Sequence, residues 1–117
     1  MIKFYGYSKW TSARKAKAWL EDNNLEFEFI DLIKNPPTKE EIKMMQEASN
    51  VDLDLIFNSR GTMFKELNLK ETINTMAYDQ KLELLSSDGK LIKRPMLFDG
   101  KNILLGFKEA EYKTTLI

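Results

Sequence analysis

The chain contains 117 residues, with 18 basic and 18 acidic side chains, so its formal net charge at neutral pH is zero. It has no cysteine and no histidine, which excludes thiolate and imidazole chemistry, and no metal-ligand pattern is visible. The neutral charge gives no overall field for nucleic acid or an anionic membrane, and no apolar run could span a bilayer. We therefore expect a cytoplasmic protein with a single domain over residues 1–117.

The first third of the chain predicts a strand, a helix and a second strand. Residues 2–6 have the composition of a short strand that ends at a glycine. Thr11 and Ser12 can cap a helix that runs to about residue 24, with apolar side chains spaced along one face. Residues 25–32 alternate apolar and acidic side chains, as a strand does. Such a β-α-β crossover places the two strands parallel.

The middle of the chain predicts mostly helix. Two prolines at residues 36 and 37 break the chain, and Thr38 followed by Glu41 has the spacing of a capping box. A helix should therefore begin at this point. We expect further helical segments, separated by turns, at residues 53–57, 69–76 and 78–85.

The last part of the chain returns to a strand pattern. A strand over residues 96–98 follows Pro95, and the Asp99-Gly100 pair predicts a tight hairpin turn into a strand over residues 102–105. A helix over residues 109–116 ends the chain. The complete order is β-α-β, helices, then β-β-α. This order predicts an α/β protein with a thioredoxin-like mixed sheet and a helical insertion at about residues 36–87.

One loop and the helix that follows it form a candidate anion site. The free amides and the dipole of a helix N-terminus favour an anion. Lys9, Arg14 and Lys15 lie around this helix start, where a helix normally prefers acidic residues. A solvated basic surface would give the same pattern.

Residues 5–16, Tyr-Gly-Tyr-Ser-Lys-Trp-Thr-Ser-Ala-Arg-Lys-Ala, resemble the Cys-x-x-Cys-Arg-Lys-Ala segment of the ArsC/Spx family. That family comprises glutaredoxin-like arsenate reductases and transcriptional regulators of the Spx and MgsR type. Further segments also resemble the family, in the family's order: residues 55–61 followed by 64–67, residues 84–95, and residues 105–108 with Tyr112. The resemblance therefore covers essentially the whole chain and implies the same thioredoxin-like fold.

The two thiol positions of the family are substituted in this chain. In the family the first cysteine is the redox or arsenate-attacking nucleophile, and the second cysteine resolves the intermediate. Trp10 and Ala13 stand at these positions, so the resemblance assigns no catalytic residue and implies no cofactor. The thiols were either lost naturally or replaced deliberately. Tryptophan is an unusual deliberate replacement, which favours natural loss.

The resemblance also implies residues that bind an oxyanion. Arg60 and Arg94 match arginines that stabilise the oxyanion in the reductases, and Thr11 and Ser12 complete the anion-binding candidates. Pro95 matches the proline that is cis in thioredoxin-like folds, so we predict a cis Arg94–Pro95 bond. The structural alternatives are a turn arginine at residue 60 and a surface strand residue at 94.

Three functions follow from these observations. The first is a non-catalytic binding or regulatory module, because Spx-type members contact the RNA polymerase α subunit. The second is an oxidoreductase of the arsenate reductase line. The third is a binder of small oxyanions or glutathione. In the first case Trp10 either plugs the former pocket against Pro95 or forms a contact for a protein partner. We expect no direct reading of DNA and no membrane partner.

Overall fold

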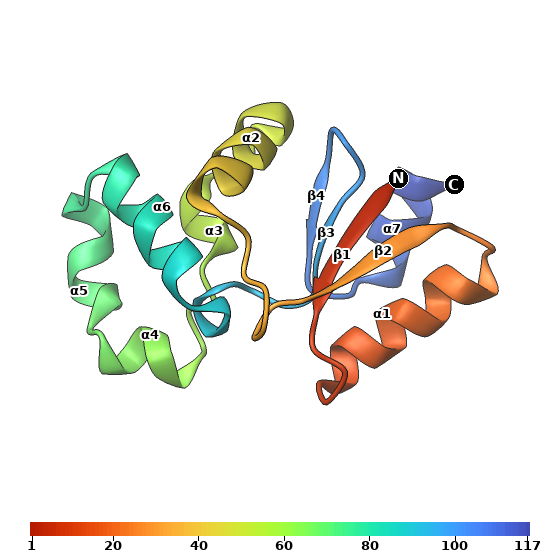
Figure 1. Cartoon of the computed structure of the whole chain (residues 1–117), viewed down its shortest axis with the longest axis horizontal. Helices are drawn as coiled ribbons and strands as arrows, with labels where there is room; N and C mark the ends of the chain where they lie inside the picture. The colour runs from red at the N-terminus through yellow and green to blue at the C-terminus, as the bar shows by residue number, and fades with distance from the viewer.

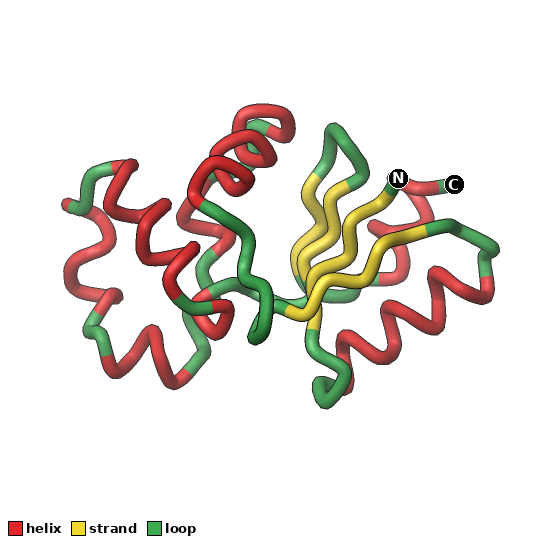
Figure 2. The backbone as a smooth tube through the Cα atoms, in the orientation of Figure 1, coloured by secondary structure: helices red, strands yellow, loops and turns green.

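The computed structural model describes all 117 residues, and a four-stranded mixed sheet forms its centre (Figures 1 and 2). β1 (Ile2–Gly6) pairs in parallel with β2 (Phe27–Asp31) and antiparallel with β3 (Met96–Phe98). β4 (Ile103–Leu105) pairs antiparallel with β3, which gives the strand order β2-β1-β3-β4. The parallel pairing of β1 with β2 confirms the predicted β-α-β crossover.

Helices cover the two faces of this sheet unequally. α1 (Thr11–Asp22) and α7 (Glu109–Leu116) lie on one side, and the helices from the middle of the chain lie on the other (Figure 1). Adjacent residues of a strand point to opposite faces. Phe4 therefore belongs to the apolar cluster beneath α1 and α7, whereas Tyr5 belongs to the larger cluster shared with the middle helices. Each layer of helices has its own core.

Five helices and two 3-10 turns lie between β2 and β3. Their bounds are α2 (Lys39–Ser49), α3 (Leu53–Ile56), α4 (Thr62–Glu66), α5 (Leu69–Thr72), η1 (Ile73–Thr75), α6 (Tyr78–Ser87) and η2 (Gly89–Leu91). The predicted capping box is present at the start of α2. α4 was not predicted from the sequence, because it is one short turn of helix without a side-chain cap. The helix predicted over residues 69–76 is divided into α5 and η1.

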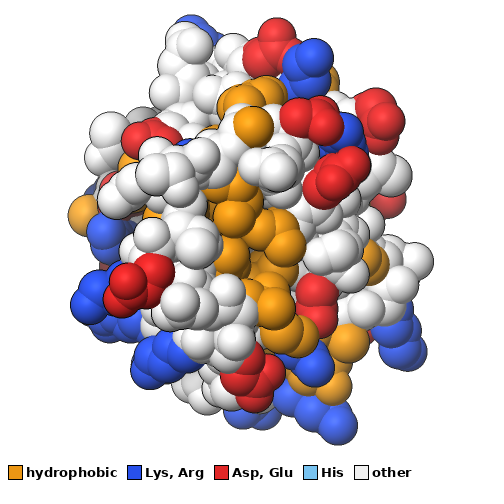
Figure 3. Space-filling view, turned by 90° about the vertical axis from the view of Figure 1, so that its left-hand side faces the viewer, with side chains coloured by type: hydrophobic (Ala, Val, Ile, Leu, Met, Phe, Trp, Pro, Cys, Tyr) orange, Lys and Arg blue, Asp and Glu red, His pale blue; other side chains and the backbone are white.

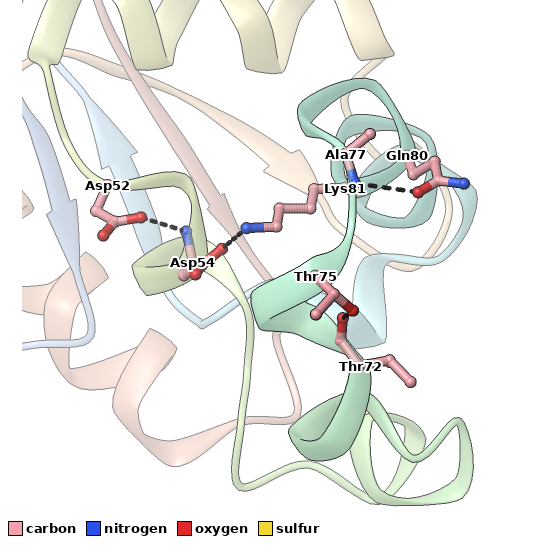
Figure 4. Close-up of polar contacts among 7 residues, drawn as sticks. All are labelled: Asp52, Asp54, Thr72, Thr75, Ala77, Gln80 and Lys81. Carbon is pink, nitrogen blue, oxygen red and sulfur yellow. Dashed lines mark hydrogen bonds and ion pairs between the residues drawn. The ribbon is translucent and has the colours of Figure 1, made fainter.

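A partly buried ion pair joins two of these helices. Lys81 Nζ of α6 lies 2.6 Å from Asp54 Oδ1 of α3 (Figure 4). Asp52 caps α3 by accepting a hydrogen bond from the Asp54 amide at 2.9 Å. Gln80 in turn accepts from the Ala77 amide at the start of α6. Both helix starts are thus fixed next to the ion pair, which holds α3 and α6 in one orientation.

The hairpin between β3 and β4 is closed by a carboxylate. Asp99 Oδ1 accepts hydrogen bonds from the amides of Lys101 at 2.9 Å and Asn102 at 2.6 Å. Gly100 has φ 103°, a conformation that glycine adopts without strain. Partial burial opposes ionisation of the carboxyl group, but the hydrogen bonds from Asn102 and Lys101 outweigh it and lower the pKa of Asp99. The predicted Asp-Gly turn is therefore stabilised by the charged form of Asp99.

The end of the molecule formed by α4, α5 and α6 carries a band of apolar side chains between charged ones (Figure 3). Two shallow hollows lie on these helices. Phe64 and Ile73 line one of them, and Met76 and Leu84 line the other. We call this surface the α4–α6 face.

The middle helices meet the sheet at a very close backbone contact. Gly89 is buried, and a Cβ atom built on it would lie only 1.9 Å from the carbonyl oxygen of Leu32. Leu32 itself donates a backbone hydrogen bond to the Gly6 carbonyl at 2.9 Å, at the end of β1. Only glycine fits at residue 89 without moving one segment away from the other.

Gly89→Ala should therefore be strongly destabilising. We expect it to lower the free energy of unfolding by about 3 kcal/mol or more, because the added methyl group overlaps backbone rather than a flexible side chain. Lys90→Ala is the matched control, since Lys90 is the exposed next residue and should change stability by less than about 0.5 kcal/mol. Urea unfolding followed by circular dichroism measures both. Equal stability of the two variants would show that the contact is not required.

Candidate functional site

The start of α1 has no side-chain cap. Trp10 occupies the N-cap position, makes no capping hydrogen bond, and precedes a first turn that contains no acidic residue. The expectation that Thr11 or Ser12 caps the helix is wrong, because Thr11 is already the first helical residue. The amides of the first turn consequently have no side-chain acceptor and remain available to a ligand.

Trp10 lies between an aromatic ring and a cation. The Tyr7 carbonyl accepts a hydrogen bond from the Trp10 amide at 3.0 Å, and this turn places the two rings edge to face with their centroids 4.9 Å apart. On the indole face, Arg94 Cζ lies 3.7 Å from the ring centroid of Trp10. Arg94 comes from the segment before β3, and its peptide bond to Pro95 is cis. We call these three side chains the Tyr7–Trp10–Arg94 stack.

Arg94, the cation of this stack, stays protonated. Partial burial lowers the pKa of Arg94, but a guanidinium group remains protonated at physiological pH. Arg94 forms no salt bridge with any carboxylate in the structure. The guanidinium group lies instead against the face of the Trp10 ring, and such a cation–π contact gains strength as water is removed from the pair.

Two hollows flank the stack. One has a volume of about 280 Å³ and lies between the stack and the middle helices, with Thr62 and Lys90 in its wall. The other has a volume of about 750 Å³ and lies over the start of α1. Trp10 and Arg94 line both hollows. Trp10 is half-buried between the two spaces that it lines.

The structure brings together some of the residues predicted to bind an anion. Thr11, Ser12 and Arg94 line the larger hollow. Arg60 is exposed in the turn before α4 and lines neither hollow. Pro95 is buried directly after Arg94. The geometry therefore gathers three of the four predicted anion-binding residues at one end of α1.

Several residues of this region were not predicted as site residues. Tyr7 could have been found, because it lies three residues before Trp10 in a short loop, where a turn brings the two rings together. Lys90 and Phe107 come from distant segments of the chain and line opposite hollows. No local sequence pattern connects either of them to Trp10.

The side chains at the site limit what it can do chemically. Lys9, Lys15 and Arg94 supply positive charge to the larger hollow, and Thr11 and Ser12 supply hydroxyl groups. No group of three or more acidic, histidine or cysteine residues is arranged to hold a metal ion. None of the helices combines the length and apolar character that a membrane span requires. The arrangement suits electrostatic and stacking contacts with a ligand or partner.

The fold and this site together define a class of protein. A mixed sheet in the order β2-β1-β3-β4, with a cis proline opening β3 beside the start of α1, is a thioredoxin-like arrangement. The model of the ArsC family matches residues 5–115 of the chain. The chain therefore belongs to the ArsC family, with tryptophan and alanine at the family's two thiol positions.

Individual relatives agree with this assignment. The chain is 46% identical over 112 residues to the Bacillus subtilis protein YusI, covering 96% of this chain and 95% of YusI. It is 37% identical over 110 residues to the regulatory protein MgsR of Bacillus subtilis, covering 94% of this chain and 86% of MgsR. The solution NMR structure of SACOL0876 from Staphylococcus aureus matches with a TM-score of 0.93 and 43% identity, covering 99% and 98% of the two chains.

A double-mutant cycle tests the contact between Trp10 and Arg94. We expect Trp10→Ala and Arg94→Ala to be coupled by about 1 kcal/mol in the free energy of unfolding, because either substitution alone removes the cation–π contact. Arg60→Ala is the matched control, since Arg60 is exposed and contacts neither hollow. It should show no coupling to Trp10→Ala. Additive effects of the Trp10 and Arg94 substitutions would rule out a stabilising contact.

Proposed function

We propose that the chain is a non-catalytic regulatory module that acts by binding another protein through the Tyr7–Trp10–Arg94 stack. The observation that carries this proposal is the contact between Trp10 and Arg94 at the family's first thiol position. An indole and, at residue 13, a methyl group supply no nucleophile for arsenate or a disulfide. The surroundings of the former thiol, by contrast, retain a cation and an uncapped helix start.

The stack has the properties of a protein contact site. Tryptophan, tyrosine and arginine are the residues most enriched among those that dominate binding energy at interfaces. Trp10 is already held by Tyr7 on one side and Arg94 on the other, so little side-chain freedom would be lost on binding. Lys9 and Lys15 give the adjoining hollow a basic rim. A partner with an acidic or polar patch beside an apolar group would fit this surface.

The family relation suggests the partner. MgsR, which shares 37% of its aligned residues with this chain, is a regulatory protein. The Spx-type regulators that the sequence resembles contact the RNA polymerase α subunit. We therefore propose the α subunit as the partner of this chain, which places its action in the cytoplasm.

Calorimetry with the C-terminal domain of the RNA polymerase α subunit tests this function. We expect the wild-type chain to bind, and Trp10→Ala and Arg94→Ala each to weaken binding by about tenfold or more, as central interface residues do. Arg60→Ala should bind with wild-type affinity. Amide NMR spectra of each variant show whether the fold is retained. Absence of binding by the wild-type chain, or unchanged affinity in Trp10→Ala, would contradict the proposal.

A second function is favoured by the larger hollow. Lys9, Lys15 and Arg94 surround the uncapped start of α1, where a small oxyanion or the carboxylates of glutathione would find positive charge and free amides. This function needs no protein partner, so it can be tested with small molecules alone.

Titration calorimetry with sulfate, phosphate, arsenate and glutathione tests this second function. We expect any heat of binding to be lost in Arg94→Ala and kept in Arg60→Ala, because Arg94 lines the larger hollow and Arg60 does not. Heat that survives in Arg94→Ala would exclude the site. Reduction of arsenate in the presence of glutathione, above a protein-free control, would instead support the oxidoreductase alternative.

A further inference from the structure

A separate pocket lies beside β2, at the start of α2. It has a volume of about 700 Å³ and is formed by β2, the loop that follows it, and the first turn of α2. Tyr5 lines it from β1, Glu28 from β2, and Glu41 from α2. It shares no lining residue with the two hollows at Trp10.

The pocket has an excess of negative charge. Glu28, Asp31 and Glu41 contribute three carboxylates to its wall, against the single cation of Lys34. Glu41 Oε1 accepts from the Thr38 amide at 3.0 Å, and Asp31 Oδ1 accepts from the amides that follow it. The second oxygen of each carboxylate and both oxygens of Glu28 make no hydrogen bond within the chain, and none of the three forms a salt bridge. Acceptor capacity therefore remains in the wall of the pocket.

Tyr5, which lines the same pocket, carries a buried hydroxyl group without a hydrogen-bond partner. The residue is only 1% exposed. Burial raises the pKa of Tyr5 to about 12, with further contributions from Glu41 and Glu28, so the hydroxyl group stays protonated. Phenylalanine would pack equally well without the cost of an unpaired polar group. Because native structures rarely leave a buried hydroxyl group unpaired, a ligand in this pocket that completes the hydrogen bonding of Tyr5 would account for it.

We propose that this pocket binds an organic cation with an alkylammonium or guanidinium group, held by Glu28 and Glu41 and by the oxygen of Tyr5. Such a group supplies several N–H donors and one positive charge, which match free carboxylate oxygens. Phe29, Ile30 and Pro37 in the wall provide apolar surface for the methylene groups that carry the cation. The acidic groups are not arranged to hold a metal ion. The cation belongs either to a free polyamine or to a lysine or arginine side chain of a protein partner.

NMR titration of the ¹⁵N-labelled full chain tests this site. The probes are spermidine, the arginine derivative N-acetyl-arginine amide, and its uncharged analogue N-acetyl-citrulline amide. We expect saturable amide shifts at residues 28–41 with the two cations and none with the citrulline compound. Tighter binding of spermidine would indicate a free polyamine, and tighter binding of the arginine compound would indicate a side chain of a partner. Equal shifts with the citrulline compound, or no saturable shift with either cation, would overturn the proposal.

Three variants distinguish binding at this site from nonspecific electrostatic attraction. Glu28→Gln should weaken cation binding about tenfold and Tyr5→Phe about fivefold, as expected for one charged and one neutral hydrogen bond. Glu26→Gln is the matched control, because Glu26 is exposed two residues before Glu28 and lies outside the pocket. It should bind as the wild type does. An equal loss in Glu26→Gln and Glu28→Gln would overturn the proposal even if Tyr5→Phe failed to fold.

Discussion

The position of the middle helices on the sheet depends on the close contact between Gly89 and the carbonyl oxygen of Leu32. Leu32 is itself bound to the end of β1, so the contact fixes η2 relative to the central strand. From η2 the chain continues directly to Arg94. Two backbone hydrogen bonds of 2.7 Å hold this stretch: the Leu91 carbonyl accepts from the Asn58 amide, and the Lys93 amide donates to the carbonyl of Ile56 at the end of α3. The close contact at Gly89, which only glycine permits, thus lies five residues before the arginine of the stack in a segment held by backbone hydrogen bonds.

The Tyr7–Trp10–Arg94 stack combines an uncapped helix start with a cation and an indole. The start of α1 has no side-chain cap, and Arg94 is charged and forms no salt bridge with a carboxylate. What differs is the group between them, which is an indole where the resemblance places a thiol. An indole cannot attack arsenate as a thiolate does. It does bind cations and apolar surfaces well. These properties support the proposal that the stack is a contact surface.

Much of the fold could be predicted because its signals are local. The capping box of Thr38 and Glu41, the Asp99–Gly100 turn and the β-α-β pattern each depend on residues close in sequence, and all three appear in the structure. α4 is too short for a helical spacing of apolar residues to be visible in the sequence. The stack could be predicted only in part, because Trp10 and Arg94 are far apart in the chain and only the family resemblance connected them. No sequence pattern predicts the acidic pocket at Tyr5, because Tyr5 fits the pattern of an ordinary residue of a buried strand.

The most direct test of a contact surface at Trp10 is to map it. Unlabelled C-terminal domain of the RNA polymerase α subunit would be titrated into the ¹⁵N-labelled chain, and the shifted amide and indole signals would be assigned. We expect the largest shifts at Tyr7, Trp10 and Arg94, with the α4–α6 face unaffected. Shifts confined to the α4–α6 face, or the absence of any saturable shift, would contradict the assignment of the stack as the binding surface.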